Sequence, residues 1–97
     1  MPNQYEVTYI LRPTLEEPEA DERVTTIAEA LKTTGGEVNG EIEKMGKRRL
    51  AYEIADVREG YYVVMKFASD AATSKELERQ LRLNEDVLRA LVIRLDG

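Results

Sequence analysis

A cluster of four cationic side chains is the feature of this sequence best suited to chemistry. The cations are Lys44, Lys47, Arg48 and Arg49, in the stretch EKMGKRRLAYEI at residues 43–54. Neighbouring arginines suit phosphate groups, because the planar guanidinium can donate two parallel hydrogen bonds to an oxyanion. Gly46, inside the cluster, lets the backbone bend or approach a ligand closely. The stretch therefore predicts a phosphate-binding site, although charged residues can also protect an exposed sheet edge from unwanted pairing.

The rest of the chain is acidic, which restricts how such a site could bind nucleic acid. The 97 residues contain 19 Asp and Glu against 14 Lys and Arg, a formal net charge of −5 at pH 7. Coating nucleic acid non-specifically requires a net excess of cations at the phosphates. Any contact with nucleic acid must therefore be confined to a local basic patch.

The sequence contains few residues suited to a catalytic or metal-binding site. The chain has no His and no Cys, which removes the commonest general base, the commonest transition-metal ligand and every thiolate. The acidic run EEPEADE at residues 16–22 could bind Mg²⁺ or Ca²⁺. Its carboxylates also suit the first turns of a helix, where the helix dipole favours anions, and their spacing matches no EF-hand loop. We therefore expect no catalytic residue, no metal site and no cofactor.

Length and composition indicate a single soluble domain over residues 1–97. A chain of this length can form one hydrophobic core but not two, and 42% hydrophobic with 34% charged residues is typical of a globular protein. No apolar run approaches the roughly 20 residues that span a bilayer, and the start, MPNQYEV, lacks the features of a secretory signal. The absence of Cys fits a reducing compartment. We expect a cytoplasmic protein with no membrane partner.

Four extended segments that could position the basic cluster are predicted from hydrophobic patterning. They cover residues 4–11, 37–54, 61–68 and 86–95. Gly40 and Gly46 mark bends or bulges in the second segment, and the polar sequence ADVREG should connect it to the third as a hairpin. The last segment has apolar residues of both parities, which predicts that more than one side of it is covered.

A helix is predicted between the first two extended segments. Its apolar stripe consists of Val24, Ile27, Ala28 and Leu31. It should end at Gly35 and Gly36. Its start fits either a capping box of Thr14 with Glu17 or Pro18 at the first helical position.

A second helix is predicted over about residues 71–83, with a capping box of Thr73 and Glu76 and a stop at Asn84. The resulting order of elements is strand, helix, strand, strand, helix, strand. It is the order of the ferredoxin-like α+β fold, a four-stranded antiparallel sheet with both helices on one face. Right-handed crossovers put the first and third strands in the centre. The basic cluster is therefore expected on an edge strand.

The face of the sheet that neither helix covers should carry several apolar side chains. The candidate residues for a partner-protein face are Ile10, Tyr62, Val64 and Lys66. An exposed apolar patch more often marks an interface than idle surface. Stacking of RNA bases on Tyr62 is an alternative, but REGYYVVMKF matches only part of the RNA-recognition pattern, because Tyr62 stands where a small residue belongs.

Four stretches of the chain resemble the family of ribosomal protein six of the bacterial small subunit. They are QYEVTYILRP (4–13), MGKRRLAYEI (45–54), EGYYVVMKF (59–67) and LRLNEDVLRALVIR (81–94), in the order and at the spacing of the family. The resemblance implies a ferredoxin-like, non-enzymatic structural protein of the cytoplasmic small ribosomal subunit. It also implies binding to small-subunit ribosomal RNA, in its central domain, together with small-subunit ribosomal protein eighteen.

Carried onto matching positions, the resemblance puts Lys47, Arg48 and Arg49 near RNA phosphates and leaves the uncovered sheet face and its rim to the partner protein. The sequence departs from the family pattern at three places, each of which bears on RNA or partner affinity. Glu53 stands where the family usually has Pro, PNQ precedes Tyr5 where members often carry Arg, and the sequence ends at Gly97 without the longer tail of many members.

A protein of a different class fits the same fold. It is a ferredoxin-like module that binds a small molecule or dimerises through its open sheet, and fold by itself does not separate the two functions. The basic cluster favours the RNA-binding protein, because a ligand-sensing module does not need it, and we expect no small-molecule substrate. An enzyme ranks third, since no nucleophile and base are brought together by the sequence.

Overall fold

The chain folds into one sheet and two helices. The computed structural model describes residues 2–54 and 57–95, and the side chains of these residues except those of 51–54 and 57. The elements are β1 (Asn3–Leu11), α1 (Glu17–Thr33), β2 (Glu37–Ile54), β3 (Val57–Ser69), α2 (Ala71–Leu83) and β4 (Val87–Arg94). The strands lie in the order β2-β3-β1-β4, and every pair of neighbours is antiparallel. This confirms the predicted ferredoxin-like α+β fold, with β1 and β3 in the centre.

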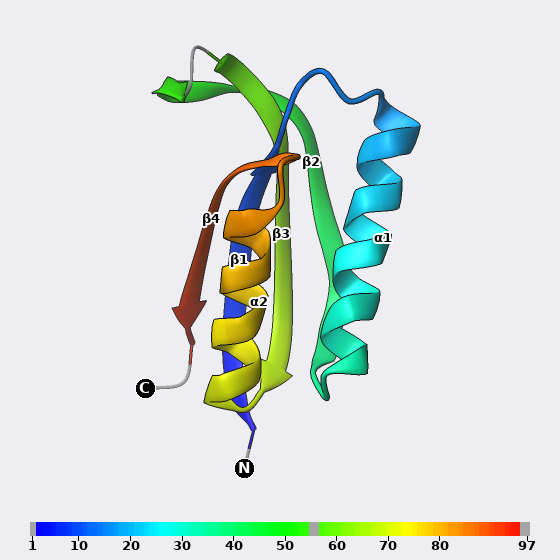
Figure 1. Ribbon diagram of the computed structural model, residues 1–97, viewed down its shortest axis with the longest axis vertical. Helices are drawn as coiled ribbons and strands as arrows, with labels where there is room; N and C mark the ends of the chain where they lie inside the picture. The colour runs from blue at the N-terminus through cyan, green and yellow to red at the C-terminus, as the bar shows by residue number, and fades with distance from the viewer. Residues whose placement is uncertain (1, 55–56, 96–97) are drawn as a thin grey trace.

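Both helices cover the same face of the sheet (Figure 1), and the core fills the space between helices and sheet. Alternate residues of β1 and β3 face the helices and are buried: Tyr5, Val7, Tyr9, Leu11, Val63, Met65 and Phe67. The rings of Tyr5 and Phe67 stack, with their centroids 5.3 Å apart. The predicted stripe of α1, including Leu31, packs against these strands. Each such side chain contributes about 1.5–3 kcal/mol through its removal from water, so this core stabilises the part of the sheet beneath the helices.

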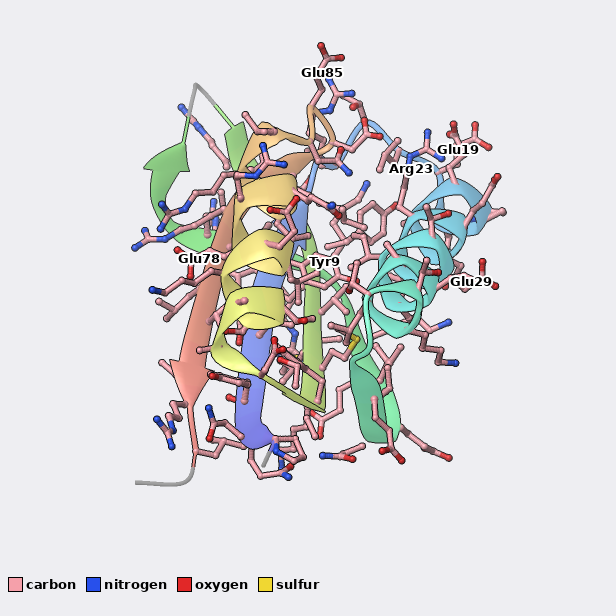
Figure 2. The ribbon with its side chains drawn as sticks, turned by 60° about the horizontal axis from the view of Figure 1, so that its bottom comes forward. Tyr9, Glu19, Arg23, Glu29, Glu78 and Glu85 are labelled. Carbon is pink, nitrogen blue, oxygen red and sulfur yellow. The ribbon has the colours of Figure 1, made fainter. Side chains whose placement is uncertain are left out.

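Charge is kept to the outside of this core. Glu19 and Glu29 project outward from α1 in Figure 2, whereas Tyr9 lies between the two helices and is fully buried. Burial raises the pKa of the Tyr9 hydroxyl, because a phenolate could not be hydrated there. The interior therefore holds a neutral phenol, and the carboxylates labelled in Figure 2 lie outside it.

The start of α1 differs from both predicted starts. The backbone N–H of Glu16 donates to Glu19 Oε1 at 3.0 Å, and the two residues form a capping box. The predicted box of Thr14 and Glu17 is therefore wrong. Glu17 is the first helical residue, so Pro18 occupies the second position rather than the first. Either position tolerates proline, because the N–H groups of the first turn have no partner within the helix.

The start of α2 was also predicted with the wrong cap. Asp70 accepts a hydrogen bond from the backbone N–H of Thr73 at 2.7 Å, so Thr73 and Glu76 do not form the capping box. Aspartate at the position before the first turn is among the strongest N-caps. The predicted ends are confirmed, since Gly35 follows α1 with a φ angle of 96° and Asn84 caps the end of α2.

The hairpin between β2 and β3 is longer than predicted. Residues 57–60 were assigned to a polar connection, but β3 begins at Val57, and Arg48 and Arg49 pair with Gly60 and Glu59. In Figure 1 the paired ends of the two strands rise above α2 and bend away from α1. Beyond the helices neither side of a strand needs apolar residues, so the hydrophobic alternation that marks a strand fades there.

The prediction that more than one side of β4 is covered is wrong. Ala90 and Val92 pack against the core, but Leu91 and Ile93 are 56% and 45% exposed on the other side. Apolar residues of both parities were taken as a sign of burial on both sides, whereas the helices reach only one. In the described part of the chain, neither helix is long and apolar enough to cross a bilayer.

Candidate nucleic-acid interface

The basic cluster lies where β2 leaves the body of the protein. Gly40 and Gly46 have positive φ angles of 71° and 77°, and the register of β2 against β3 shifts next to both. Glycine adopts such angles without the strain that a Cβ would cause, which confirms the two predicted bulges. We call residues 47–54 of β2 and 57–61 of β3 the basic arm.

The bulge before Gly46 decides on which side of the sheet the cations lie. Lys44 pairs with Val63, whereas Gly46 pairs with Tyr62, so Met45 is the additional residue of the bulge. Strict alternation would place Lys44 and Gly46 on the same side. The additional residue instead puts Lys44 on the side that the helices cover and Gly46 on the open face, which is the side without helices.

The four predicted cations therefore do not form one patch. Lys47 pairs with Tyr61 and lies, like Lys44 and Arg49, on the helix-covered side, whereas Arg48 lies on the open face. The cations of the arm thus point to both sides of the same edge strand. Successive side chains of a strand alternate between its two faces. An RNA backbone that passes along this edge of the sheet could therefore contact Lys47 and Arg49 on one side and Arg48 on the other.

The contacts of the cations separate Lys44 from the other three. Lys44 Nζ lies 3.4 Å from Asp21 Oδ1 on α1. Arg48 Nε donates to the carbonyl of Met45 in its own strand at 3.2 Å. Lys47, Arg48 and Arg49 are exposed and, within the described residues, form no ion pair with a carboxylate. The arm therefore presents three successive positive charges, while the charge of Lys44 is shared with an acidic helix.

The predicted partner-protein face is only partly exposed. Tyr62 and Val64 are half-buried and Lys66 is exposed. Ile10, expected on the same exposed surface, is only 7% exposed. It lies over Gly60, where a Cβ would come within 2.5 Å of Ile10 Cγ2. The absence of a side chain at Gly60 therefore lets Ile10 fold down onto the sheet.

Two residues of β4 extend the open face and were not singled out from the sequence. Leu91 and Ile93 lie opposite Thr8 and Glu6 of β1 and are the more exposed apolar residues of this face. The sequence signal for them is the run of apolar residues of both parities in β4, from which burial on both sides was predicted. They extend the open face to β4, the edge strand opposite β2, and Thr8 of β1 lies between Leu91 and Val64.

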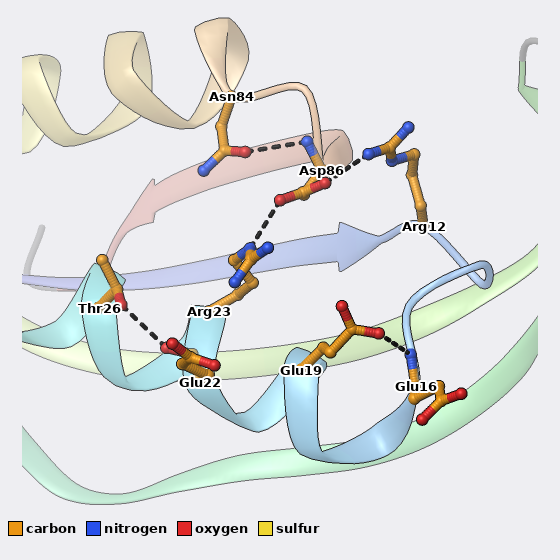
Figure 3. Close-up of polar contacts among 8 residues, drawn as sticks. All are labelled: Arg12, Glu16, Glu19, Glu22, Arg23, Thr26, Asn84 and Asp86. Carbon is orange, nitrogen blue, oxygen red and sulfur yellow. Dashed lines mark hydrogen bonds and ion pairs between the residues drawn. The ribbon is translucent and has the colours of Figure 1, made fainter.

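A second group of arginines lies around Asp86, in the turn before β4. Asp86 Oδ1 accepts a hydrogen bond from Arg12 Nη2 at 2.5 Å, and Oδ2 accepts one from Arg23 Nε at 2.7 Å (Figure 3). Asn84 Oδ1 accepts from the backbone N–H of Asp86 at 2.9 Å. The bond from Arg23, followed by that from Arg12, lowers the pKa of Asp86 and stabilises its charged form. This group joins the loop after β1, the helix α1 and the turn before β4.

Two observations on the described residues bear on the binding of metals and small molecules. These residues contain no group of three or more His, Cys, Asp or Glu residues that could hold a metal ion. A cleft of about 110 Å³ between α1 and α2 is lined by Thr26, Ile27, Ala30, Leu77, Gln80, Leu81 and Asn84. Its volume is well below the roughly 300 Å³ at which small-molecule sites begin. Of the predicted features, the side chain of Glu53 lies outside the described residues.

Comparison with known proteins gives one consistent family. The family model of ribosomal protein S6 matches residues 4–94. Small ribosomal subunit protein bS6 of Carboxydothermus hydrogenoformans is 48% identical over 96 residues, 99% of each chain. The protein of the same name from Desulforudis audaxviator is 45% identical over 93 residues, 96% of this chain and 98% of its own. The crystal structure of 30S ribosomal protein S6 from Thermotoga maritima is similar with a TM-score of 0.90 at 29% identity, over 98% of this chain and 89% of that one.

Proposed function

Because the chain belongs to the ribosomal protein S6 family, we propose that it binds small-subunit ribosomal RNA through its basic arm, together with ribosomal protein eighteen. As a protein of the small ribosomal subunit it works in the cytoplasm. Residues 1–97 act as one structural, non-enzymatic domain. The RNA is bound in its central domain, and the sheet face without helices is left to the protein partner.

The observation that carries the RNA proposal is the row of Lys47, Arg48 and Arg49. These cations are exposed and have no carboxylate partner within the described residues, in a chain whose net charge is −5. A cation without a carboxylate partner can interact with a phosphate through its full charge. The guanidinium of arginine can in addition donate two parallel hydrogen bonds to the phosphate oxygens. Lys44, which the sequence placed in the same site, is held by Asp21 and contributes less.

A protein partner is proposed because the arm by itself supplies few phosphate contacts. The row of Lys47, Arg48 and Arg49 neutralises about three phosphates, which is too few for the specific affinity of an assembly site against bulk RNA. The open face exposes Leu91 and Ile93 on β4, and exposed apolar residues of this kind often mark an interface. A basic partner docked on this face would complement the acidic chain and add its own cations to the RNA surface.

The RNA proposal is tested by titrating the central-domain RNA fragment with wild-type protein and with an Arg48→Ala/Arg49→Ala variant. The variant should bind more weakly, and the slope of its log affinity against log salt should be shallower by about 1–2 units, since each lost phosphate contact removes just under one released counterion. Arg79→Ala/Arg82→Ala is the matched control, because it removes the same charge from α2, where both arginines pair with glutamates. Equal salt slopes for wild type and the arm variant would contradict the assignment of the arm.

The partner proposal is tested by repeating the wild-type titration in the presence of ribosomal protein eighteen. The affinity for the RNA fragment should increase, because the two proteins together present more cations than either one. The same affinity in both series would show that the partner is dispensable for RNA binding.

A further inference from the structure

Lys47 differs from Lys44 and Arg48 in what holds it. Its Nζ lies over the ring of Tyr61, 5.4 Å from the ring centroid. Lys47 and Tyr61 are directly opposed in the β2–β3 pairing, so the contact follows from the strand register. A lysine within about 6 Å of a tyrosine ring centroid is attracted to the negative face of the ring.

The Tyr61 ring is itself held in place by the body of the protein. Its hydroxyl donates to the carbonyl of Leu15, 2.9 Å away and 46 positions earlier in the chain. Leu15 belongs to the buried core, and Tyr61 packs against that core. On its other side, β3 pairs Tyr61 with Leu11 of β1. The ring is thus a fixed surface at the base of an arm that otherwise extends beyond the helices.

The ring and a carboxylate have different effects on a lysine. Asp21 orders Lys44 but also supplies a counter-charge. The Tyr61 ring orders Lys47 and leaves the ammonium with its full charge and with donors that point away from the ring. The flexible lysine side chain would otherwise lose rotamer freedom on binding a phosphate. Part of that loss is avoided when the folded protein already restricts it.

We propose that Tyr61 is a positioning residue that orders Lys47 for contact with an RNA phosphate. The inference rests on the proposed RNA-binding function of the arm and adds to it a residue that touches no RNA. Tyr61 acts through Lys47, so its substitution should weaken RNA binding only while Lys47 is present.

The binding test uses four variants with the central-domain RNA fragment and ribosomal protein eighteen present: Tyr61→Leu, Tyr61→Phe, Lys47→Ala and the double variant Lys47→Ala/Tyr61→Leu. Tyr61→Leu should weaken binding about three-fold, because Lys47 would then lose its rotamer freedom in the binding step. Tyr61→Phe keeps the ring and should bind as wild type does. In the Lys47→Ala background, Tyr61→Leu should cause no further loss, because the two substitutions remove the same interaction.

The salt dependence separates positioning from contact. Lys47→Ala should reduce the salt slope by about one unit, because a phosphate contact is lost, whereas Tyr61→Leu should leave the slope unchanged. Additive losses in the double variant, wild-type affinity of Tyr61→Leu, or a reduced slope for Tyr61→Leu would each overturn the inference. Wild-type affinity and slope for both Lys47→Ala and Arg48→Ala/Arg49→Ala would instead overturn the RNA-binding role of the arm.

A measurement on the free protein keeps the inference testable without RNA. The ε-methylene protons of Lys47 should show an upfield ring-current shift in the NMR spectrum of wild type and Tyr61→Phe. The shift should disappear in Tyr61→Leu, while the amide spectrum of β1 and α1 shows that this variant is folded. An unshifted Lys47 in the wild-type protein would overturn the inference whatever the RNA titrations give.

Discussion

The body of the protein and the basic arm use the same β3 strand for opposite purposes. In the body, Met65 and Phe67 are fully buried under the helices, and the arginines near it, Arg12 and Arg23, share the carboxylate of Asp86. In the arm, Lys47, Arg48 and Arg49 are exposed and have no carboxylate partner within the described residues. Partnered cations stabilise the fold, whereas unpartnered cations are available to a ligand. Stability and RNA affinity should therefore respond to different substitutions.

The largest expected effect comes from the core of the body. Phe67→Ala should lower the free energy of unfolding by about 3–5 kcal/mol, because it removes a fully buried ring that stacks on Tyr5. Arg49→Ala, in the arm, should stay within about 0.5 kcal/mol of wild type. Denaturant unfolding of both variants checks the contrast. A similar loss of stability in the two would mean that the arm is part of the cooperative core.

Alanine substitutions at Gly46 of β2 and Gly60 of β3 test how tightly the base of the arm is packed. A Cβ at Gly60 would lie 2.5 Å from Ile10 Cγ2 and 2.8 Å from the Leu11 carbonyl oxygen, whereas one at Gly46 would meet nothing within 4 Å. Gly60→Ala should therefore cost about 1–3 kcal/mol through overpacking. Gly46→Ala should cost about 1–2 kcal/mol through its positive φ alone. Equal thermal stability of wild type and Gly60→Ala would show that the open face is not packed against the base of the arm.

The open face should affect partner binding without affecting phosphate contacts. Leu91→Ser/Ile93→Ser should weaken binding of ribosomal protein eighteen by about ten-fold, because apolar area buried at the centre of an interface carries much of its energy. Calorimetric titration of the two proteins measures this loss, and Leu83→Ser, which changes an exposed leucine on α2, is the control. The salt slope for RNA should be unchanged in the double variant. A loss of similar size in the control would place the partner elsewhere.

The smallest effect should be the pH dependence caused by Asp86. Its pKa is lowered in the folded protein, first by the hydrogen bond from Arg23 and then by that from Arg12. Its contribution to stability is therefore fully present above its unfolded pKa of about 4 and is lost as the pH falls through the folded value. Wild type should be more stable than Asp86→Asn at pH 7, and the difference should shrink below about pH 4. A difference that does not change with pH would show that the charge of Asp86 does not contribute.

Local patterns in the amino-acid sequence were enough to predict the order of the elements and most of the core. Both follow from local periodicity: the stripe that contains Leu31 recurs at helical spacing, and the alternation of β1 and β3 has period two. The bulge at Gly46 was equally readable, because a positive φ angle is a property that glycine supplies on its own. The basic cluster was visible because its residues are neighbours in the chain.

Which residues act together could be seen only in the folded protein. The bulge shifts the alternation of β2 by one residue, and for that reason Lys44 pairs with Asp21 and Arg48 faces the open side. Asp86 meets Arg12 and Arg23 from 74 and 63 positions away, and Tyr61 reaches Leu15 from 46 positions away. Such pairs depend on strand register and on how the turns close over the core. Strand register and the path of the turns leave no local pattern in the sequence, because both are set by contacts between elements that are distant in the chain.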